Sequence, residues 1–279
     1  MQIDLFPAPR PEPTEIVSAA IAQYHPVAAF ALFSGGNGSL AGTHWAMNNI
    51  SGCQVAHIDT GIGIPRTQEF VRETCKREGW PLTVIRAKED CGQDYDQIVL
   101  QHGFPGPGCH SKMYIRLKER GIEELVRRNK KKFSRQKVML LTDICHDDSV
   151  RRSGYGNVLT KTKGGQLWVN AMYWCDASWM HRYVNDAGIP RNPVAYELGM
   201  SGECLCGAFA DKGELSVVRM VCPALAARIE RLQEQVKFTS HPWGWEDRPP
   251  KERDDKQTLD IFDLPMCRGC LKEQERRTA

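Results

Sequence analysis

The chain has 279 residues, of which 41% are hydrophobic and 25% are charged, and its formal net charge at pH 7 is +3. This length can bury a sizeable core, most simply as one α/β domain with an appended segment, and the small net charge provides no overall field that would attract a polyanion. No apolar stretch reaches the roughly 18 residues that span a bilayer, and no charged-then-apolar signal sequence is present, so we expect a cytoplasmic protein without a membrane partner.

Strand-like and helix-like segments alternate along the chain, a pattern typical of a parallel sheet covered by helices. Prolines at positions 7 to 13 indicate an extended leader before the first helix. Residues 154–165 contain four glycines and predict a long loop, and the polar, proline-rich residues 241–260 predict a linker. The expected strands are 27–33, 53–58, 82–85 and 137–142, and the expected helices are 39–49, 67–78, 111–128, 176–187 and 217–236.

The most informative stretch is the junction of the first strand and the helix after it. The apolar run stops at Ser34-Gly35-Gly36, and a helix-compatible segment begins at Ser39. Glycines allow a tight turn and a close approach to the backbone, and the N–H groups and positive dipole of a helix N-terminus favour an anion. The junction therefore predicts a phosphate or sulfate site, although it matches neither the Walker A loop nor the dinucleotide fingerprint.

Two further polar clusters follow predicted strands. Asp59 and Thr60 come directly after the second strand, and the segment from Asp143 to Arg152 follows the fourth. In an open parallel sheet, ligands bind beyond the carboxyl ends of the strands. We expect the three clusters to meet in one crevice.

Several motifs together resemble the superfamily of PP-loop ATP pyrophosphatases and phosphoadenosine-phosphosulfate (PAPS) reductases. Ser34, Gly35, Gly36 and Ser39 match its Ser-Gly-Gly-x-Asp-Ser loop. The likeness covers about residues 28–210. Its other motifs, in chain order, are His57-Ile-Asp-Thr-Gly61, Gly106-Pro-Gly-Cys-His110, Asp148-Ser149-x-x-Arg152, Ile189-Pro-Arg-Asn-Pro193 and Gly202-Glu-Cys-Leu-Cys-Gly207.

The resemblance implies an adenine nucleotide alpha-hydrolase-like α/β fold that binds ATP with Mg²⁺. It divides the chain into residues 1–24 (leader and first helix), 25–210 (PP-loop nucleotide-binding domain) and 211–279 (helical segment, linker and cysteine-bearing tail). The residues that it implies as catalytic are Ser34, Ser39, Asp148 and Arg152. The residues that it implies as nucleotide-binding are Ser34, Gly35, Gly36, Asn37, Gly38, Ser39, Asp59, Thr60 and Arg151.

Two positions depart from the family pattern. Gly38 stands where the loop usually has an Asp that positions the nucleotide and metal, and Cys145 stands where many members have Arg. Another carboxylate, from Asp59, Asp147 or Asp148, would then have to support Mg²⁺. The C-terminal Glu-Cys-Gly-Leu-His of thioredoxin-dependent PAPS reductases is absent from the sequence, which disfavours an ordinary sulfate-assimilation reductase.

Two close cysteine pairs, Cys204-x-Cys206 and Cys267-x-x-Cys270, predict a metal centre with four thiolate ligands. Cys222 and Cys109 are alternates for one member of the set. Resemblance to the iron–sulfur sulfurtransfer branch, which includes the DNA-phosphorothioation protein DndC, favours a [4Fe–4S] cluster over zinc.

Three functions are consistent with these features. The first is an enzyme that activates a substrate by adenylation with release of pyrophosphate, for sulfur transfer in nucleic-acid modification. The second is a reductase of a sulfonucleotide, and the third is a catalytically degenerate nucleotide-binding partner in a modification or defence complex, which Gly38 and Cys145 favour. Besides the nucleotide, the expected partners are DNA or tRNA, a sulfur donor such as a cysteine desulfurase, and a second copy of the chain.

Overall fold

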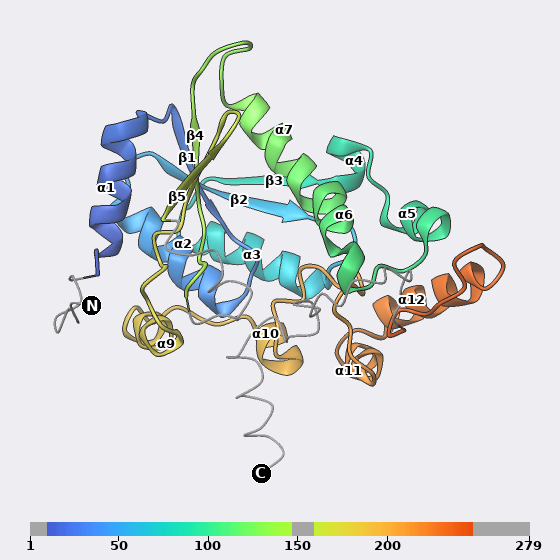
Figure 1. Ribbon diagram of the computed structural model, residues 1–279. Helices are drawn as coiled ribbons and strands as arrows, with labels where there is room; N and C mark the ends of the chain where they lie inside the picture. The colour runs from blue at the N-terminus through green and yellow to red at the C-terminus, as the bar shows by residue number, and fades with distance from the viewer. Residues whose placement is uncertain (1–9, 147–158, 248–279) are drawn as a thin grey trace, which may run out of the picture.

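The computed structural model describes residues 10–146 and 159–247. Its centre is a six-stranded sheet in the order β3-β2-β1-β4-β6-β5 (Figure 1). All neighbouring strands are parallel except β5 and β6, which form an antiparallel hairpin at one edge. The strands are β1 (Ala28–Leu32), β2 (Cys53–Asp59), β3 (Leu82–Arg86), β4 (Val138–Leu141), β5 (Thr160–Lys163) and β6 (Gln166–Val169).

Helices cover both faces of this sheet. On one face, α1 (Pro13–Tyr24), α2 (Asn37–Asn49), α3 (Pro65–Arg77) and α9 (Ala177–Asp186) contribute to one hydrophobic cluster with Ala29 and Ala31 of β1. On the other face, Phe30 packs with residues of α7 (Arg120–Arg128). Side chains alternate along a strand, so β1 supplies both cores. The prediction of an α/β fold with a parallel sheet is confirmed.

A second group of helices packs beside the sheet and forms its own apolar cluster, on the right of Figure 1. This cluster includes residues of the loop after β2 and of the cysteine-bearing segment 201–206. Its helices are α5 (Tyr95–His102), α10 (Pro193–Leu198), α11 (Glu214–Val221) and α12 (Pro223–Val236), and the short α4 (Ala87–Cys91) follows β3.

The expected helix over 111–128 is continuous but not uniform. A 3₁₀ turn (Pro107–Cys109) leads into α6 (His110–Tyr114), a π-helical stretch (Ile115–Glu119) and α7. π-helical turns are rare and are frequent at functional sites. The π-helical stretch contains Lys118, which forms an ion pair with Glu203.

Two expectations about the secondary structure of the second half of the chain need correction. The single helix expected over 217–236 is divided at Cys222, because Pro223 lacks the N–H that would continue α11. Part of the expected glycine-rich loop is the β5–β6 hairpin, whose Thr-Lys-Thr-Lys strand lacks an apolar alternation.

The expected linker packs onto the protein as far as Asp247. Trp245 is 1% exposed, and its indole N–H donates to the carbonyl oxygen of Leu205 at 2.9 Å. The ring also lies against Gly207, where an added Cβ would come within 2.7 Å of Trp245 Cδ1. Trp245 therefore packs against residues 205–207, at the end of the cysteine-bearing segment. Within residues 10–146 and 159–247, no helix is long and apolar enough to span a membrane.

Candidate functional site: a serine–glycine loop beside an aspartate carboxylate

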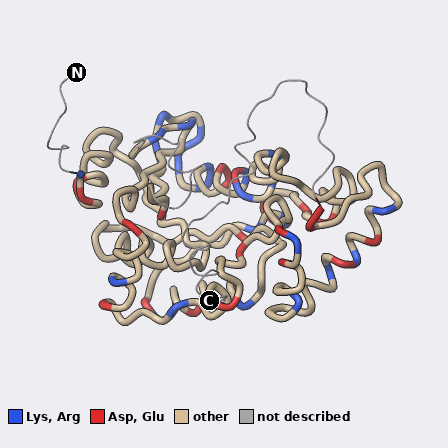
Figure 2. Tube along the Cα trace, turned by 60° about the horizontal axis from the view of Figure 1, so that its bottom comes forward, with Lys and Arg blue, Asp and Glu red and all other residues tan. Residues whose placement is uncertain are grey.

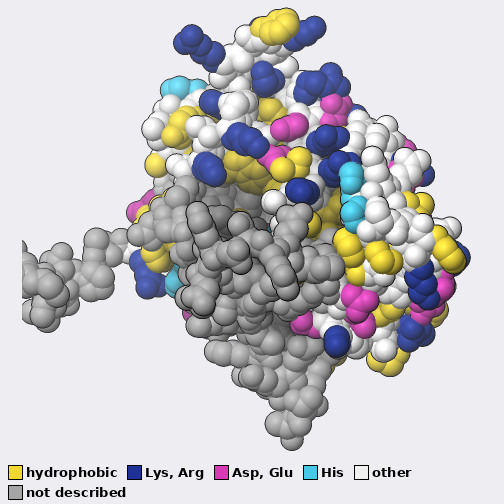
Figure 3. Space-filling view, turned by 45° about the vertical axis from the view of Figure 1, so that its right-hand side comes forward, with side chains coloured by type: hydrophobic (Ala, Val, Ile, Leu, Met, Phe, Trp, Pro, Cys, Tyr) yellow, Lys and Arg dark blue, Asp and Glu magenta, His cyan; other side chains and the backbone are white. Residues whose placement is uncertain are grey.

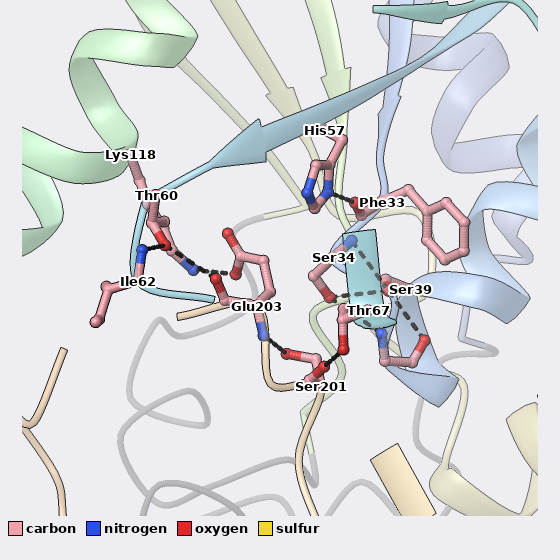
Figure 4. A network of polar contacts seen from close by, with 11 residues as sticks. Phe33, Ser34, Ser39, His57, Thr60, Ile62, Thr67, Lys118, Ser201 and Glu203 are labelled. Carbon is pink, nitrogen blue, oxygen red and sulfur yellow. Dashed lines mark hydrogen bonds and ion pairs between the residues drawn. The ribbon is translucent and has the colours of Figure 1, made fainter. Parts of the chain in front are cut away.

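The loop between β1 and α2 is held by its two serines. The hydroxyl groups of Ser34 and Ser39 are 2.9 Å apart, and the Ser39 hydroxyl also donates to the carbonyl of Gly36 at 3.0 Å (Figure 4). The backbone N–H of Ser34 points to Ser39 Oγ at 3.3 Å. Both hydroxyls therefore face the same small volume and fix the shape of the loop.

The first N–H groups of α2 lack backbone acceptors in the part of the chain that the structure describes. The first intrahelical bond of α2 joins the N–H of Leu40 to the carbonyl of Gly36, so the N–H groups of residues 37–39 have no backbone acceptor within the described residues. The N-cap, Gly36, has no capping side chain, and the first turn holds no acidic residue. These donors and the positive end of the helix dipole suit a phosphate group.

Gly35 is placed by a contact between distant parts of the chain. Its φ of +83° is left-handed, and an added Cβ would lie 2.8 Å from Thr67 Cγ2. The Asn192 side chain donates to the Gly35 carbonyl at 2.9 Å and to Thr67 Oγ1 at 3.2 Å, while its oxygen accepts from the N–H of Val194. Asn192, from the Ile-Pro-Arg-Asn-Pro segment, thus fixes the loop and caps α10. Residues 189–193 are one of the motifs on which the sequence resemblance rests, but the motif alone did not indicate that Asn192 contacts Gly35.

We expect Asn192→Asp to lower the free energy of unfolding by about 1–3 kcal/mol, because it removes both donors and leaves the buried Gly35 carbonyl unpaired. Aspartate retains the acceptor that caps α10, so it separates loop positioning from helix capping. Urea denaturation of the two proteins measures the difference. An unchanged midpoint and slope would show that the contact to Gly35 contributes nothing.

The carboxylate of Asp143 lies beside Gly38 and Gly42 at the start of α2. A Cβ added to Gly38 would lie 2.8 Å from Asp143 Oδ2, and one added to Gly42 would lie 3.4 Å from Asp143 Cβ. Ser39, Thr142 and Asp143 also line one small cavity between α2 and the ends of β1 and β4. Pairing of β1 with β4 brings Asp143, the first residue of the third expected cluster, beside the first cluster. Residues 147–152 of that cluster lie outside the described residues, so the meeting of all three clusters stays a prediction. Asp143 is not among the carboxylates that the sequence suggested for Mg²⁺.

The second expected cluster has structural contacts of its own. Thr60 is fully buried; its hydroxyl donates to the carbonyl of Glu203 at 2.9 Å. Asp59 Oδ1 accepts from the N–H of Gly61 at 2.9 Å and from Gln68 Nε2 at 2.8 Å. Their roles in holding a nucleotide stay predictions. The other expected contacts, Asp147, Asp148, Arg151 and Arg152, lie outside the described residues.

Residues 201–206 run alongside the loop after β2 and border the serine–glycine loop. The N–H of Ile64 donates to the Gly202 carbonyl at 2.8 Å, and that of Leu205 to the Ile62 carbonyl at 2.9 Å. Ser201 lies over Gly36, with its Cβ 3.3 Å from an added Cβ there. The cysteine-bearing segment is thereby fixed beside the candidate phosphate site (Figure 4).

An ion pair between a half-buried lysine and a buried glutamate anchors the same segment. Lys118 Nζ is 2.7 Å from Glu203 Oε2, and the Glu203 side chain is only 6% exposed (Figure 4). Burial alone would lower the pKa of Lys118, but the Glu203 carboxylate outweighs this effect and raises the pKa above its ordinary value. The lysine therefore remains charged and joins the π-helical stretch to the cysteine-bearing segment. No local pattern in the sequence indicated this pair.

Cys204 and Cys206 are two positions apart and influence each other's titration. The neighbouring thiol of Cys206 and burial raise the pKa of Cys204, whereas the thiol of Cys204 lowers the pKa of Cys206. Within the described ranges, no three His, Cys, Asp or Glu side chains gather as a metal site, so the structure does not bring the alternates Cys109 and Cys222 to this pair. Cys267 and Cys270 lie outside the described residues, and the four-cysteine centre stays a prediction.

Other cysteines are core thiols. Burial raises the pKa of Cys53 and Cys175 to about 11 and that of Cys75 to about 12. We expect these three to resist iodoacetamide in the native protein near pH 8 and to react after denaturation, since the thiolate is the nucleophile. Peptide mass spectrometry measures this, and native labelling of any of the three would contradict their burial.

The same shifts predict a loss of stability in alkali. A thiol whose pKa is raised by folding stabilises the protein fully below its unfolded pKa near 9.0, and the contribution is lost as the pH rises through 11 to 12. Urea unfolding at a series of pH values above 9 should show a falling free energy. A flat profile would contradict the shifts.

No protein-family model and no curated protein sequence matches the chain. Its structure is similar to that of phosphoadenylyl-sulfate (PAPS) reductase from Candida auris in a phosphate complex, with 14% identity, coverage of 68% of this chain and 86% of that chain, and a TM-score of 0.49. It is also similar to the U34-tRNA thiolase NcsA from Methanococcus maripaludis with its [4Fe-4S] cluster, with 12% identity, coverage of 81% and 80%, and a TM-score of 0.40. Both similarities are of overall α/β fold and single out no particular branch.

Proposed function

We propose that the protein is an enzyme that binds ATP, or a related adenine nucleotide, with its phosphates on residues 34–39. The observation that carries this proposal is the serine–glycine loop with open helix amides beside the carboxylate of Asp143. The amides and hydroxyls suit the phosphate oxygens. The sequence resemblance described above supports an adenine nucleotide as the ligand.

The reaction proposed is adenylation of an acceptor followed by sulfur transfer. An acceptor oxygen attacks the α-phosphorus, the bond from that phosphorus to the bridging oxygen breaks, and pyrophosphate leaves with the bonding electrons. A sulfur nucleophile from a donor then displaces AMP from the adenylate. The protein contributes positioning and charge stabilisation, because phosphoryl transfer needs little covalent help from side chains.

Mg²⁺ fits this site through one protein carboxylate and the phosphates themselves. Such ions are commonly held by one or two carboxylates together with substrate phosphates, and they neutralise charge that develops on the phosphate oxygens. Asp143, whose Oδ2 lies 2.8 Å from a Cβ added at Gly38, would be the protein carboxylate that holds the ion. The protein's own part is to hold that carboxylate and the two serines in fixed positions around the phosphates.

Four thiolates from Cys204, Cys206, Cys267 and Cys270 are proposed to hold a [4Fe–4S] cluster, with zinc as the alternative. The adjacent thiols of Cys204 and Cys206 fit half of such a set. The visible spectrum and the iron, sulfide and zinc content of oxygen-free protein test this. A broad band near 400 nm with about four irons supports the cluster, one zinc supports a structural site, and absence of both metals contradicts the four-cysteine centre.

Product analysis tests the reaction. ATP labelled at the α-phosphate is incubated with Mg²⁺, the purified chain, and tRNA or DNA as acceptor. AMP and pyrophosphate are expected from the wild type and not from Ser34→Ala/Ser39→Ala, provided that the variant keeps the circular dichroism of the wild type. ADP and phosphate as products would contradict adenylation.

A sulfonucleotide reductase is the second candidate, favoured by the lowered pKa of Cys206 in a segment whose Ser201 lies over Gly36 of the phosphate loop. It would release sulfite from APS or PAPS without ATP. Measurable ATP binding with no turnover of any of these substrates would instead support the degenerate nucleotide-binding partner.

A further inference from the structure

A basic projection stands away from the candidate site, and we define it as the loop 130–137 together with the β5–β6 hairpin. The two parts are in direct contact: the N–H of Val138 donates to the carbonyl of Gly165 at 2.9 Å, and Lys137 Nζ donates to the carbonyl of Gly164 at 2.5 Å. The loop projects at the top of Figure 1, beyond α7. Fold contacts thus unite two basic segments that are separated in sequence.

The charge of the basic projection is concentrated. Residues 127–137 contain seven Lys or Arg and no Asp or Glu, and Figure 2 shows Lys and Arg gathered on this loop. Some are neutralised: Glu124 pairs with Arg127 and Arg128, and Glu119 pairs with Lys163. Four others have no acidic partner among the residues that the structure describes, namely Lys131, Lys132, Arg135 and Lys161.

Phe133 lies at the tip of this loop with 92% of its surface exposed. Its φ of +58° is in the left-handed region, which is unfavourable for a bulky side chain. The turn is fixed by other groups: the Lys131 N–H donates to Gln136 Oε1 at 2.9 Å, and the Ser134 hydroxyl donates to the Lys131 carbonyl at 2.7 Å. The loop therefore holds an aromatic ring in solvent next to a lysine. Figure 3 shows Lys and Arg side chains gathered at the top of the molecule.

We propose that the basic projection binds single-stranded nucleic acid, with phosphates on Lys131, Lys132 and Lys161 and a base stacked on Phe133. Single-strand binding combines cations that follow the backbone with an aromatic ring on which a base stacks. Lys132 Nζ lies 5.1 Å from the ring centroid, in a cation–π contact. A membrane surface fits less well, because stable membrane binding needs a larger apolar face than one phenylalanine.

The projection and the nucleotide site lie at opposite ends of the sheet. The basic loop leads into the amino end of β4, whereas Ser34 and Asp143 follow the carboxyl ends of β1 and β4. The surface is therefore a docking site for a polymer and does not depend on the proposed nucleotide chemistry. An unpaired region of either DNA or RNA presents the same phosphates and bases.

Fluorescence anisotropy of the full chain with labelled oligonucleotides of about 16 nucleotides tests this. We expect Phe133→Ala to weaken binding about 10-fold or more, the loss typical of one stacked base. Lys131→Glu/Lys132→Glu should weaken it further and reduce the slope of log K against log salt by about 1.4, for two single-strand phosphate contacts. Single-stranded RNA, single-stranded DNA and duplex DNA are compared; both single strands should bind more tightly than the duplex.

The control Arg72→Glu/Lys76→Glu changes the same charge on exposed positions of α3, outside the projection, and should leave affinity within about 2-fold. Ser34→Ala should bind the oligonucleotide like the wild type, which separates this proposal from the nucleotide site. No binding near 50 mM salt, or equal binding by wild type and both projection variants, would overturn the proposal. So would tighter, Phe133-dependent binding to phosphatidylserine vesicles than to any oligonucleotide.

Discussion

Asp143→Asn should reduce turnover of ATP about 100-fold and abolish the effect of Mg²⁺ on ATP affinity. The reason is that the substitution preserves the shape of the side chain while removing the charge placed beside the phosphate loop. Affinity for ATP in the absence of Mg²⁺ should be unchanged or tighter, since a negative charge near the phosphates is lost. Isothermal titration calorimetry with and without Mg²⁺ measures both effects. Equal Mg²⁺ dependence in the two proteins would remove Asp143 from the site.

A transfer of the carboxylate tests the same idea more sharply. Gly38→Asp alone should impair the protein, because its Cβ would lie 2.8 Å from Asp143 Oδ2 and two carboxylates would share one volume. Gly38→Asp/Asp143→Ala moves the acid from the segment after β4 to the start of α2, close to where the Asp143 carboxylate lies, and should recover Mg²⁺-dependent ATP binding relative to Asp143→Ala. Gly38→Ala is the control for the steric contact alone. A double variant no better than Asp143→Ala would contradict functional replacement.

Lys118→Met should lower the free energy of unfolding by about 1–3 kcal/mol, because it leaves the buried Glu203 carboxylate without its half-exposed cation. Lys118→Met/Glu203→Gln removes both charges and should recover a large part of this loss. Urea denaturation of wild type, both single variants and the double variant gives the coupling energy directly. Additive effects of the two substitutions would show that the ion pair does not hold the cysteine-bearing segment.

The ion pair also predicts a dependence on pH. Because the pKa of Lys118 is raised on folding, its contribution is complete below the unfolded value near 10.5 and is lost as the pH rises through the folded value above it. The stability difference between wild type and Lys118→Met should therefore be constant from neutral pH to about 10 and then shrink. A difference that grows in alkali would contradict the raised pKa.

The local features of the phosphate loop could be predicted because they are contiguous in sequence. An apolar strand, a Ser-Gly-Gly turn and a helix N-terminus occur within residues 27–49, and each has a local physical signature. The parallel sheet was predictable from the alternation of such segments. In contrast, Thr-Lys-Thr-Lys of β5 and the short α4, α5 and α10 have weak periodicity, so their structure depends on tertiary pairing.

The partners of the loop could not be predicted for a different reason. Asp143 approaches Gly38 through pairing of β1 with β4, and Asn192 approaches Gly35 through packing of α10 against α3. Lys118 meets Glu203 only because the tertiary fold brings the π-helical stretch beside residues 201–206. These contacts connect residues separated by 85 positions or more, and nothing in the intervening sequence specifies them.

The affinity of ATP and adenosine for the wild type and Ser34→Ala tests the central claim most directly. If the phosphates occupy residues 34–39, calorimetry should show one ATP site per chain and at least about a 10-fold loss of ATP affinity in the variant, the effect typical of one lost hydrogen bond to a charged group. Adenosine, which lacks phosphates, should bind both proteins equally. Equal ATP affinity in both proteins, or no ATP binding to the wild type, would contradict the account.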